Sequence, residues 1–136
     1  MRFARWVFTL AGIFGLVMIT PLFFLEGRMA EMGGPITRPE NYYGFLGVTF
    51  AWQLVYLLIG RDPARYRPLM LLGALGKTVF GVSVWVLALQ GRTPMTVAYV
   101  ATPDLVLAAL FVIAWARTKP STPLDAPPQG ELPRSG

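Results

Sequence analysis

The chain has 136 residues, of which 54% are hydrophobic and only 14% are charged, with a formal net charge of +5. A soluble domain carries roughly 25% charged residues, so this composition is typical of a membrane protein. Cysteine and histidine are both absent, which excludes disulfides, Cys/His zinc sites, haem ligation through either residue and His-based nucleophilic triads.

The few charges are segregated and leave four long apolar runs. Residues 6–25 and 41–60 contain no charge, and residues 68–91 and 93–116 contain one charge each. About 20 apolar residues are enough to cross the hydrocarbon layer as a helix. A transmembrane β-barrel would need alternating runs of about 10 residues, and none is visible. The sequence therefore predicts an all-α fold, a four-helix transmembrane bundle.

The membrane domain is expected to cover residues 1–117. Its helices are predicted at about 5–25, 42–60, 68–89 and 94–116. The short link QGRT makes the last two helices antiparallel neighbours. Residues 118–136 are rich in proline and poor in apolar side chains, which predicts a disordered cytoplasmic tail.

The first apolar run follows Arg2 and Arg5, as the apolar region of a secretory signal peptide follows its basic N-terminus. It is longer than a signal h-region of roughly 7–15 residues, and no A-x-A-like cleavage site follows it. We therefore expect a retained helix. Gly12 and Gly15 lie near one face of it and would let a neighbouring helix approach closely. Pro21 predicts a kink towards its far end.

The second apolar run opens with polar and aromatic residues. Glu40, Asn41 and Tyr43 are candidate ligand contacts at the outer mouth of the bundle. The simpler alternative, which we favour, is an aromatic belt at the start of a helix. Small residues recur along the same helix and predict a packing face. This face is formed by Gly44, Gly47 and Ala51.

Basic residues gather on one side of the predicted bundle. The N-terminus, the loop 61–67 and the C-terminal side hold eight arginines and lysines, against three on the other side. Because positively charged loops stay in the cytoplasm, both termini are expected there, in a multi-pass protein of the bacterial inner (plasma) membrane. Arg61, Arg65 and Arg67 are candidate contacts for lipid headgroups. The high pI reflects these loops, so no nucleic-acid partner is expected.

Lys77 stands alone in the apolar stretch LLGALGKTVFGVSVW. It lies 10 residues after Arg67, which places it about 15 Å into the membrane. Gly73 and Gly81 flank it at intervals of four residues, so the lysine shares their helix face. Intramembrane charges usually face the bundle and find a partner there.

The partner follows from the geometry of the hairpin. If the turn is centred between Gly91 and Arg92, residue 106 is level with Lys77, and Asp104 lies about 3 Å away along the axis. The same reasoning across the preceding loop makes Gln53 a third member of a buried polar layer. Proline at position 103 adds a free backbone carbonyl beside this layer.

This polar layer has two interpretations. In the first, Lys77 and Asp104 form a structural ion pair that fixes helix register, as buried pairs can do without adding stability. In the second, the layer is a functional site for a proton, an ion or a small ligand. No catalytic residue, metal ligand or cofactor is assigned in either case.

The segment PENYYGFLGVTFAWQLVYLLIGRDPARYRP, together with Lys77 and Asp104, resembles four-span bacterial membrane proteins of uncharacterised function. In size and helix layout the chain is also similar to DoxX-like proteins. Some of those are linked to quinone-dependent oxidation, and others act as accessory subunits. No catalytic DoxX motif is present, so the resemblance implies topology and no residue role.

Two functions from different classes follow. The first, which we favour, is a non-enzymatic accessory or assembly module in a homo-oligomer or larger membrane complex. The alternative is a small carrier, or a quinone- or lipid-binding membrane protein, that uses the polar layer. In both cases the lipid bilayer is the immediate partner.

Overall fold

The computed structural model describes residues 2–120 and is helical almost throughout. Four stretches, Arg2–Phe24, Pro39–Arg61, Arg67–Leu89 and Met95–Arg117, are long and apolar enough to cross a membrane. The predicted all-α fold is therefore confirmed. The elements are α1 (Arg2–Ile19), the 3-10 helix η1 (Thr20–Phe24), α2 (Glu26–Gly33), α3 (Pro39–Arg61), α4 (Arg67–Leu89) and α5 (Met95–Arg117). Most of the predicted tail lies outside the described residues.

Proline and glycine set several of the helix boundaries. At Pro21 the chain does not kink within one helix; α1 ends at Ile19 and the tighter η1 follows, because proline removes a backbone donor. Pro39 occupies the first turn of α3, where that missing donor has no intrahelical partner to lose. Gly91 has a φ of 70° in the link from α4 to α5, a left-handed conformation that glycine adopts without steric cost.

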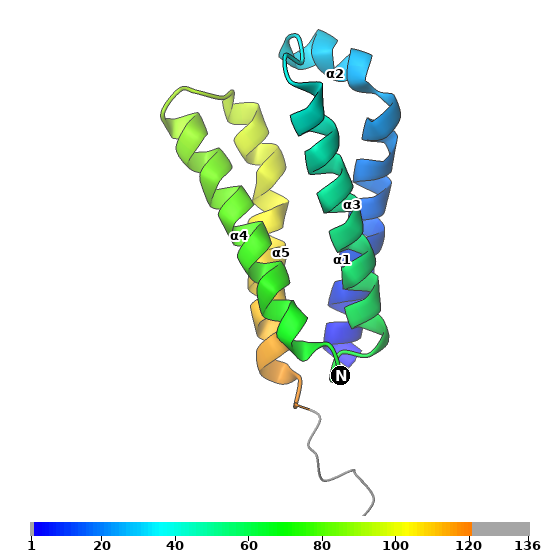
Figure 1. The fold of residues 1–136 in the computed structure, drawn as a ribbon. Coiled ribbons are helices and arrows are strands. Elements are labelled where there is room, and N and C mark those ends of the chain that lie inside the picture. The colour runs from blue at the N-terminus through cyan, green and yellow to red at the C-terminus, as the bar shows by residue number, and fades with distance from the viewer. Residues whose placement is uncertain (1, 121–136) are drawn as a thin grey trace, which may run out of the picture.

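The helices form two antiparallel hairpins that lie side by side (Figure 1). One consists of α1 and α3, joined through η1 and α2, and the other of α4 and α5; contacts within each hairpin far outnumber those between them. The N-terminus and the end of α5 lie at the same end of the bundle, opposite α2. Which side of a membrane that end faces stays a prediction from the charges.

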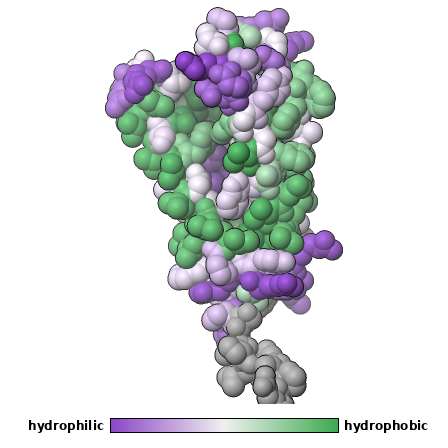
Figure 2. All heavy atoms as spheres, viewed as in Figure 1, coloured by the Kyte–Doolittle hydropathy of each residue, from purple (hydrophilic) through white to green (hydrophobic). Residues whose placement is uncertain are grey.

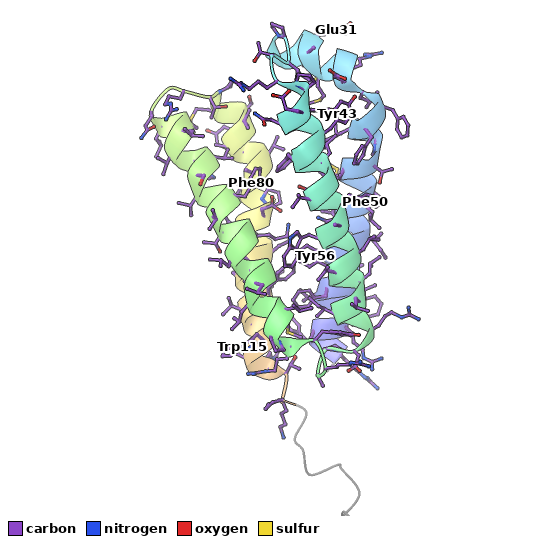
Figure 3. All side chains as sticks on the ribbon, viewed as in Figure 1. Glu31, Tyr43, Phe50, Tyr56, Phe80 and Trp115 are labelled. Atoms are coloured by element: carbon purple, nitrogen blue, oxygen red, sulfur yellow. The ribbon has the colours of Figure 1, made fainter. Side chains whose placement is uncertain are left out.

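Aromatic side chains join the two hairpins in the half of the bundle near the N-terminus. Phe8 of α1 stacks on Phe111 of α5 with ring centroids 4.2 Å apart, and both are fully buried. Tyr56 of α3 packs against Phe111 at 4.9 Å and against Phe8 at 6.1 Å. In Figure 3, Tyr56 points from α3 towards the second hairpin. We call Phe8, Tyr56 and Phe111 the aromatic cluster.

Small residues let α1 and α3 approach closely, as the sequence predicts. A Cβ at Gly12 would lie 2.8 Å from the Leu57 side chain, and one at Gly15 would overlap the Gln53 side chain. The packing face predicted on α3 is wrong for the isolated chain, since Gly44 and Gly47 are exposed and a Cβ at either position would meet nothing within 4 Å. Ala51 is exposed as well. The α3 residues that are buried instead are Leu46, Gln53, Tyr56, Ile59 and Gly60.

Two glycines of α4 give a matched test of this packing. A Cβ at Gly73 would lie 2.9 Å from the Tyr56 ring, whereas a Cβ at Gly76 would meet nothing within 4 Å. We expect Gly73→Ala to lower the free energy of unfolding by about 1–3 kcal/mol through overpacking. Gly76→Ala should leave it unchanged or raise it by up to about 1 kcal/mol. Thermal unfolding in detergent measures both, and equal effects would contradict the observed packing.

Candidate functional site

An ion pair joins α4 to α5 near the middle of both helices. Lys77 Nζ lies 2.5 Å from Asp104 Oδ1 and donates a hydrogen bond to it. The Lys77 side chain is 12% exposed and that of Asp104 is 29% exposed. The structure thus brings together Lys77 and Asp104, which the hairpin geometry places within reach of each other. Hydrophilic atoms show between the two hairpins, within the apolar band of the surface (Figure 2).

The surroundings of the pair come from both hairpins. Lys77 Nζ lies 5.5 Å from the centre of the Tyr56 ring, within the range of a cation–π interaction. Gly73 and Gly81 are buried on the same face of α4, where Gly73 packs against Tyr56 and Gly81 against Leu105. The ion pair is therefore linked through Tyr56 to the aromatic cluster. Sequence reasoning missed Tyr56, although it lies only three residues after Gln53 in α3.

Gln53 does not join the ion pair, which corrects the predicted three-residue layer. Its side chain packs against Gly15 of α1, and its Nε2 donates a hydrogen bond of 2.9 Å to the Thr49 carbonyl. No hydrogen bond links it to Lys77 or Asp104 in the described part of the chain. Gly15 leaves the room that this amide fills, so α3 turns Gln53 towards its own hairpin.

A second polar contact connects α4 and α5 closer to their link. Trp85 Nε1 donates a hydrogen bond of 3.2 Å to Thr102 Oγ1, which donates one of 2.9 Å to the Ala98 carbonyl. Pro103 follows directly within α5, and the helix continues through it. Thr102 accordingly bonds a carbonyl in the turn before the proline, not the Tyr99 carbonyl that the proline frees.

The three candidate outer-mouth residues share the first turns of α3 but not one site. Glu40 and Asn41 are exposed, and Glu40 Oε1 lies 3.9 Å from Arg38 Nη1. The Tyr43 hydroxyl donates a hydrogen bond of 2.6 Å to Glu26 Oε2 at the start of α2. Tyr43 thereby ties α3 to α2 at the end of the bundle opposite the N-terminus (Figure 3).

The three candidate headgroup arginines separate into two groups. Arg61 and Arg65 are exposed and remain available for lipid headgroups. Arg67 is committed to α5: its Nε donates hydrogen bonds to the carbonyls of Thr118, at 2.7 Å, and Trp115, at 3.2 Å. Its guanidinium also lies 4.3 Å from the Trp115 ring. The last carbonyls of a helix lack intrahelical donors, so Arg67 caps α5.

This capping role predicts different effects for two neighbouring arginines. Arg67→Met should lower the free energy of unfolding by about 1.5 kcal/mol, since it removes charged hydrogen bonds to α5. Arg65→Met should change it by less than about 0.5 kcal/mol, as expected for an exposed residue. Hydrogen exchange at residues 114–118 checks the mechanism. Unchanged protection there in Arg67→Met would show that the cap contributes nothing.

Within residues 2–120, the ion pair lies in neither a metal-binding cluster nor an enclosed ligand pocket. This range contains no group of three or more acidic side chains placed to hold a metal ion. Two shallow hollows lie elsewhere on the surface. One is lined by Arg5, Trp6, Thr9 and Gly60, and the other by Thr20, Phe23, Phe24 and Phe50. Within the pair, one hydrogen bond joins the ammonium to the carboxylate.

Comparison with models of protein families, with curated proteins and with solved structures finds no match for this chain. The similarity to DoxX-like proteins in size and layout stays an expectation from the sequence. No residue role is transferred from another protein.

Proposed function

We propose that this chain is a non-enzymatic accessory or assembly module of a membrane complex. Lys77 and Asp104 act in it as a structural lock that sets the register of α4 against α5. The observation that carries the proposal is the closed ion pair, with Nζ and Oδ1 2.5 Å apart near the middle of two apolar helices. We place the module in the bacterial inner membrane with both termini in the cytoplasm.

The physical case for a lock begins with the alternatives open to two apolar helices. Faces of small residues pack closely but differ little in energy when one helix slides past another, because lipid and protein are equally apolar. One charge at the bilayer centre costs about 2.5–3.5 kcal/mol on insertion scales. A slip of one turn would separate Lys77 from Asp104 and expose both to this cost. The pair therefore selects one register.

The case for a partner comes from the exposed side of α3. Gly44, Gly47 and Ala51 lie at helical spacing on this side, and a Cβ at either glycine would meet no neighbour in the described part of the chain. Small residues are enriched where membrane helices meet, because they let backbones approach. This face supports an accessory role, in which a helix of another subunit covers it.

Two substitutions test the role. Gly47→Leu fills the small-residue face of α3, and the control Val106→Leu adds bulk on α5 at a position that is 56% exposed. Neither should disturb the bundle, since both positions are exposed. After purification in a mild detergent, the wild type and Val106→Leu should retain one protein partner in fixed stoichiometry, and Gly47→Leu should lose it. A wild type that purifies alone, or equal retention by all three proteins, would contradict the module.

The alternative, a small carrier or a quinone- or lipid-binding protein, is favoured by one observation. The Asp104 side chain keeps 29% of its surface exposed. Its carboxylate is therefore open to a ligand that approaches from the bilayer. This function predicts binding that depends on pH and is lost in Asp104→Asn, which isothermal titration with a short-chain quinone would detect.

A further inference from the structure

We propose that the hollow lined by Arg5, Trp6, Thr9 and Gly60 binds one anionic phospholipid. It has a volume of about 340 Å³ and lies between α1 and α3, at the end of the bundle that holds the N-terminus. Arg5 belongs to the first turn of α1, and Gly60 is the penultimate residue of α3. The hollow is thus at the ends of two candidate spans, the level at which lipid headgroups lie. This inference does not depend on the module role.

The floor of the hollow is created by one glycine. A Cβ at Gly60 would overlap the Thr9 hydroxyl, so the absence of a side chain lets α1 and α3 meet there. Trp6 is 66% exposed at the rim. An indole at the membrane interface offers an apolar face to acyl chains and an N–H group to the headgroup region.

The lining supplies donors that match a phosphodiester. The Arg5 guanidinium, the Trp6 indole N–H and the Thr9 hydroxyl make no side-chain hydrogen bond or ion pair with other residues of the range 2–120. No acidic residue of that range lines the hollow. Arg61 follows Gly60 directly and is exposed, which adds a second positive charge beside the floor. Phosphate oxygens accept from guanidinium groups in strong, charge-assisted hydrogen bonds.

Charge complementarity and the apolar surroundings together favour a lipid over a free anion. Leu10 and Ile13, one helical turn after Trp6 and Thr9 on α1, are apolar and exposed. A soluble phosphate would use only the donors, whereas a phospholipid also covers the Trp6 face and this apolar surface with its acyl chains. Burial of that surface adds to the affinity, so the headgroup and the chains act together.

Native mass spectrometry of the full chain in detergent tests the site. Phosphatidylglycerol and phosphatidylcholine are titrated against the wild type, Arg5→Gln, Trp6→Leu and the control Arg28→Gln. Arg28 is an exposed arginine of α2 at the opposite end of the bundle, so the control makes the same change in charge. We expect the first phosphatidylglycerol to bind about tenfold more tightly than phosphatidylcholine, as one charge-assisted bond implies. Arg5→Gln should remove this preference, and Arg28→Gln should retain it.

Trp6→Leu keeps the charge and separates the two parts of the site. It should weaken both lipids while leaving the preference between them, and its exposure makes a folding defect unexpected. Three results would overturn the proposal. These are equal binding of the two lipids by the wild type, equal losses in Arg5→Gln and Arg28→Gln, and displacement of the lipid by millimolar inorganic phosphate, which would indicate an anion site alone.

Discussion

Replacing Lys77 with Met, or Asp104 with Leu, is expected to lower the free energy of unfolding by about 3–5 kcal/mol. Each single change removes one partner of the 2.5 Å ion pair and leaves the other charge unpaired at mid-membrane. The double variant Lys77→Met/Asp104→Leu removes both charges and keeps similar side-chain volumes. It should recover most of the loss, as buried pairs replaced by apolar residues often do. Unfolding by SDS in mixed micelles measures all three.

Two lipid-facing substitutions on the same helices are the controls. Leu75→Met on α4 and Val106→Leu on α5 change residues that are 59% and 56% exposed, so each should shift the unfolding midpoint little. The coupling energy from the double-mutant cycle then isolates the pair. Single variants as stable as the wild type, or a double variant no better than the worse single one, would show that the pair does not hold α4 to α5.

The second large effect is expected at Phe111, the residue that connects the hairpins most closely. It is fully buried and packs against Phe8 and Tyr56. Phe→Ala in a soluble core costs about 3–5 kcal/mol. In water, part of this cost is the free energy of transferring the ring from the core to solvent. In a bilayer this part largely disappears, because lipid is as apolar as the core. The cost that remains comes from the cavity and from the lost van der Waals contacts. We expect a loss near the lower limit of that range, about 3 kcal/mol.

Phe14→Ala gives the matched control for this prediction. Phe14 lies on α1 and is 51% exposed, so the same chemical change there should cost less than about 1 kcal/mol. The same SDS titration applies. In Phe111→Ala the two hairpins should also separate more readily, which faster hydrogen exchange in α1 and α5 would report. Equal losses at positions 14 and 111 would mean that the aromatic cluster does not join the hairpins.

The number of helices and the ion pair follow from simple features of the sequence. Charges at the ends of long apolar runs define the spans, and the structure has four helices of that kind in residues 2–120. The link between α4 and α5 is short, which leaves little freedom in their relative register. Counting residues from its centre is therefore enough to place Asp104 within reach of Lys77, and the structure has these side chains in contact.

The rotation of α3 about its own axis cannot be predicted in the same way. In a soluble protein the polar face of a helix marks the solvent side, but lipid and core are both apolar, and α3 carries small residues on two faces. The sequence predicts packing at Gly44 and Gly47, but both are exposed. It also predicts that Gln53 faces Lys77, but Gln53 faces α1. The position of Tyr56 beside Lys77 depends on the same rotation.

Arg67 shows a second limit of sequence reasoning. Its place in a basic loop predicts a headgroup contact, as for Arg61 and Arg65. The structure instead uses it to cap α5 through the carbonyls of Trp115 and Thr118. These acceptors are 48 and 51 residues away in the sequence, so the contact exists only once α4 and α5 are side by side.

The most direct test of the structural role of the ion pair compares what the wild type and Lys77→Met/Asp104→Leu retain during purification in a mild detergent. Proteins and small molecules bound to each are quantified by mass spectrometry, after unfolding measurements show that both chains are folded. If the pair acts only on the register of α4 against α5, the folded double variant should retain the same small molecules, because no ligand contacts the pair. It should also retain the same protein partner in the same stoichiometry, because that partner is expected to cover the exposed face of α3. A quinone, lipid or other small molecule held by the wild type and lost by the folded double variant would contradict this role and identify the pair as a binding site.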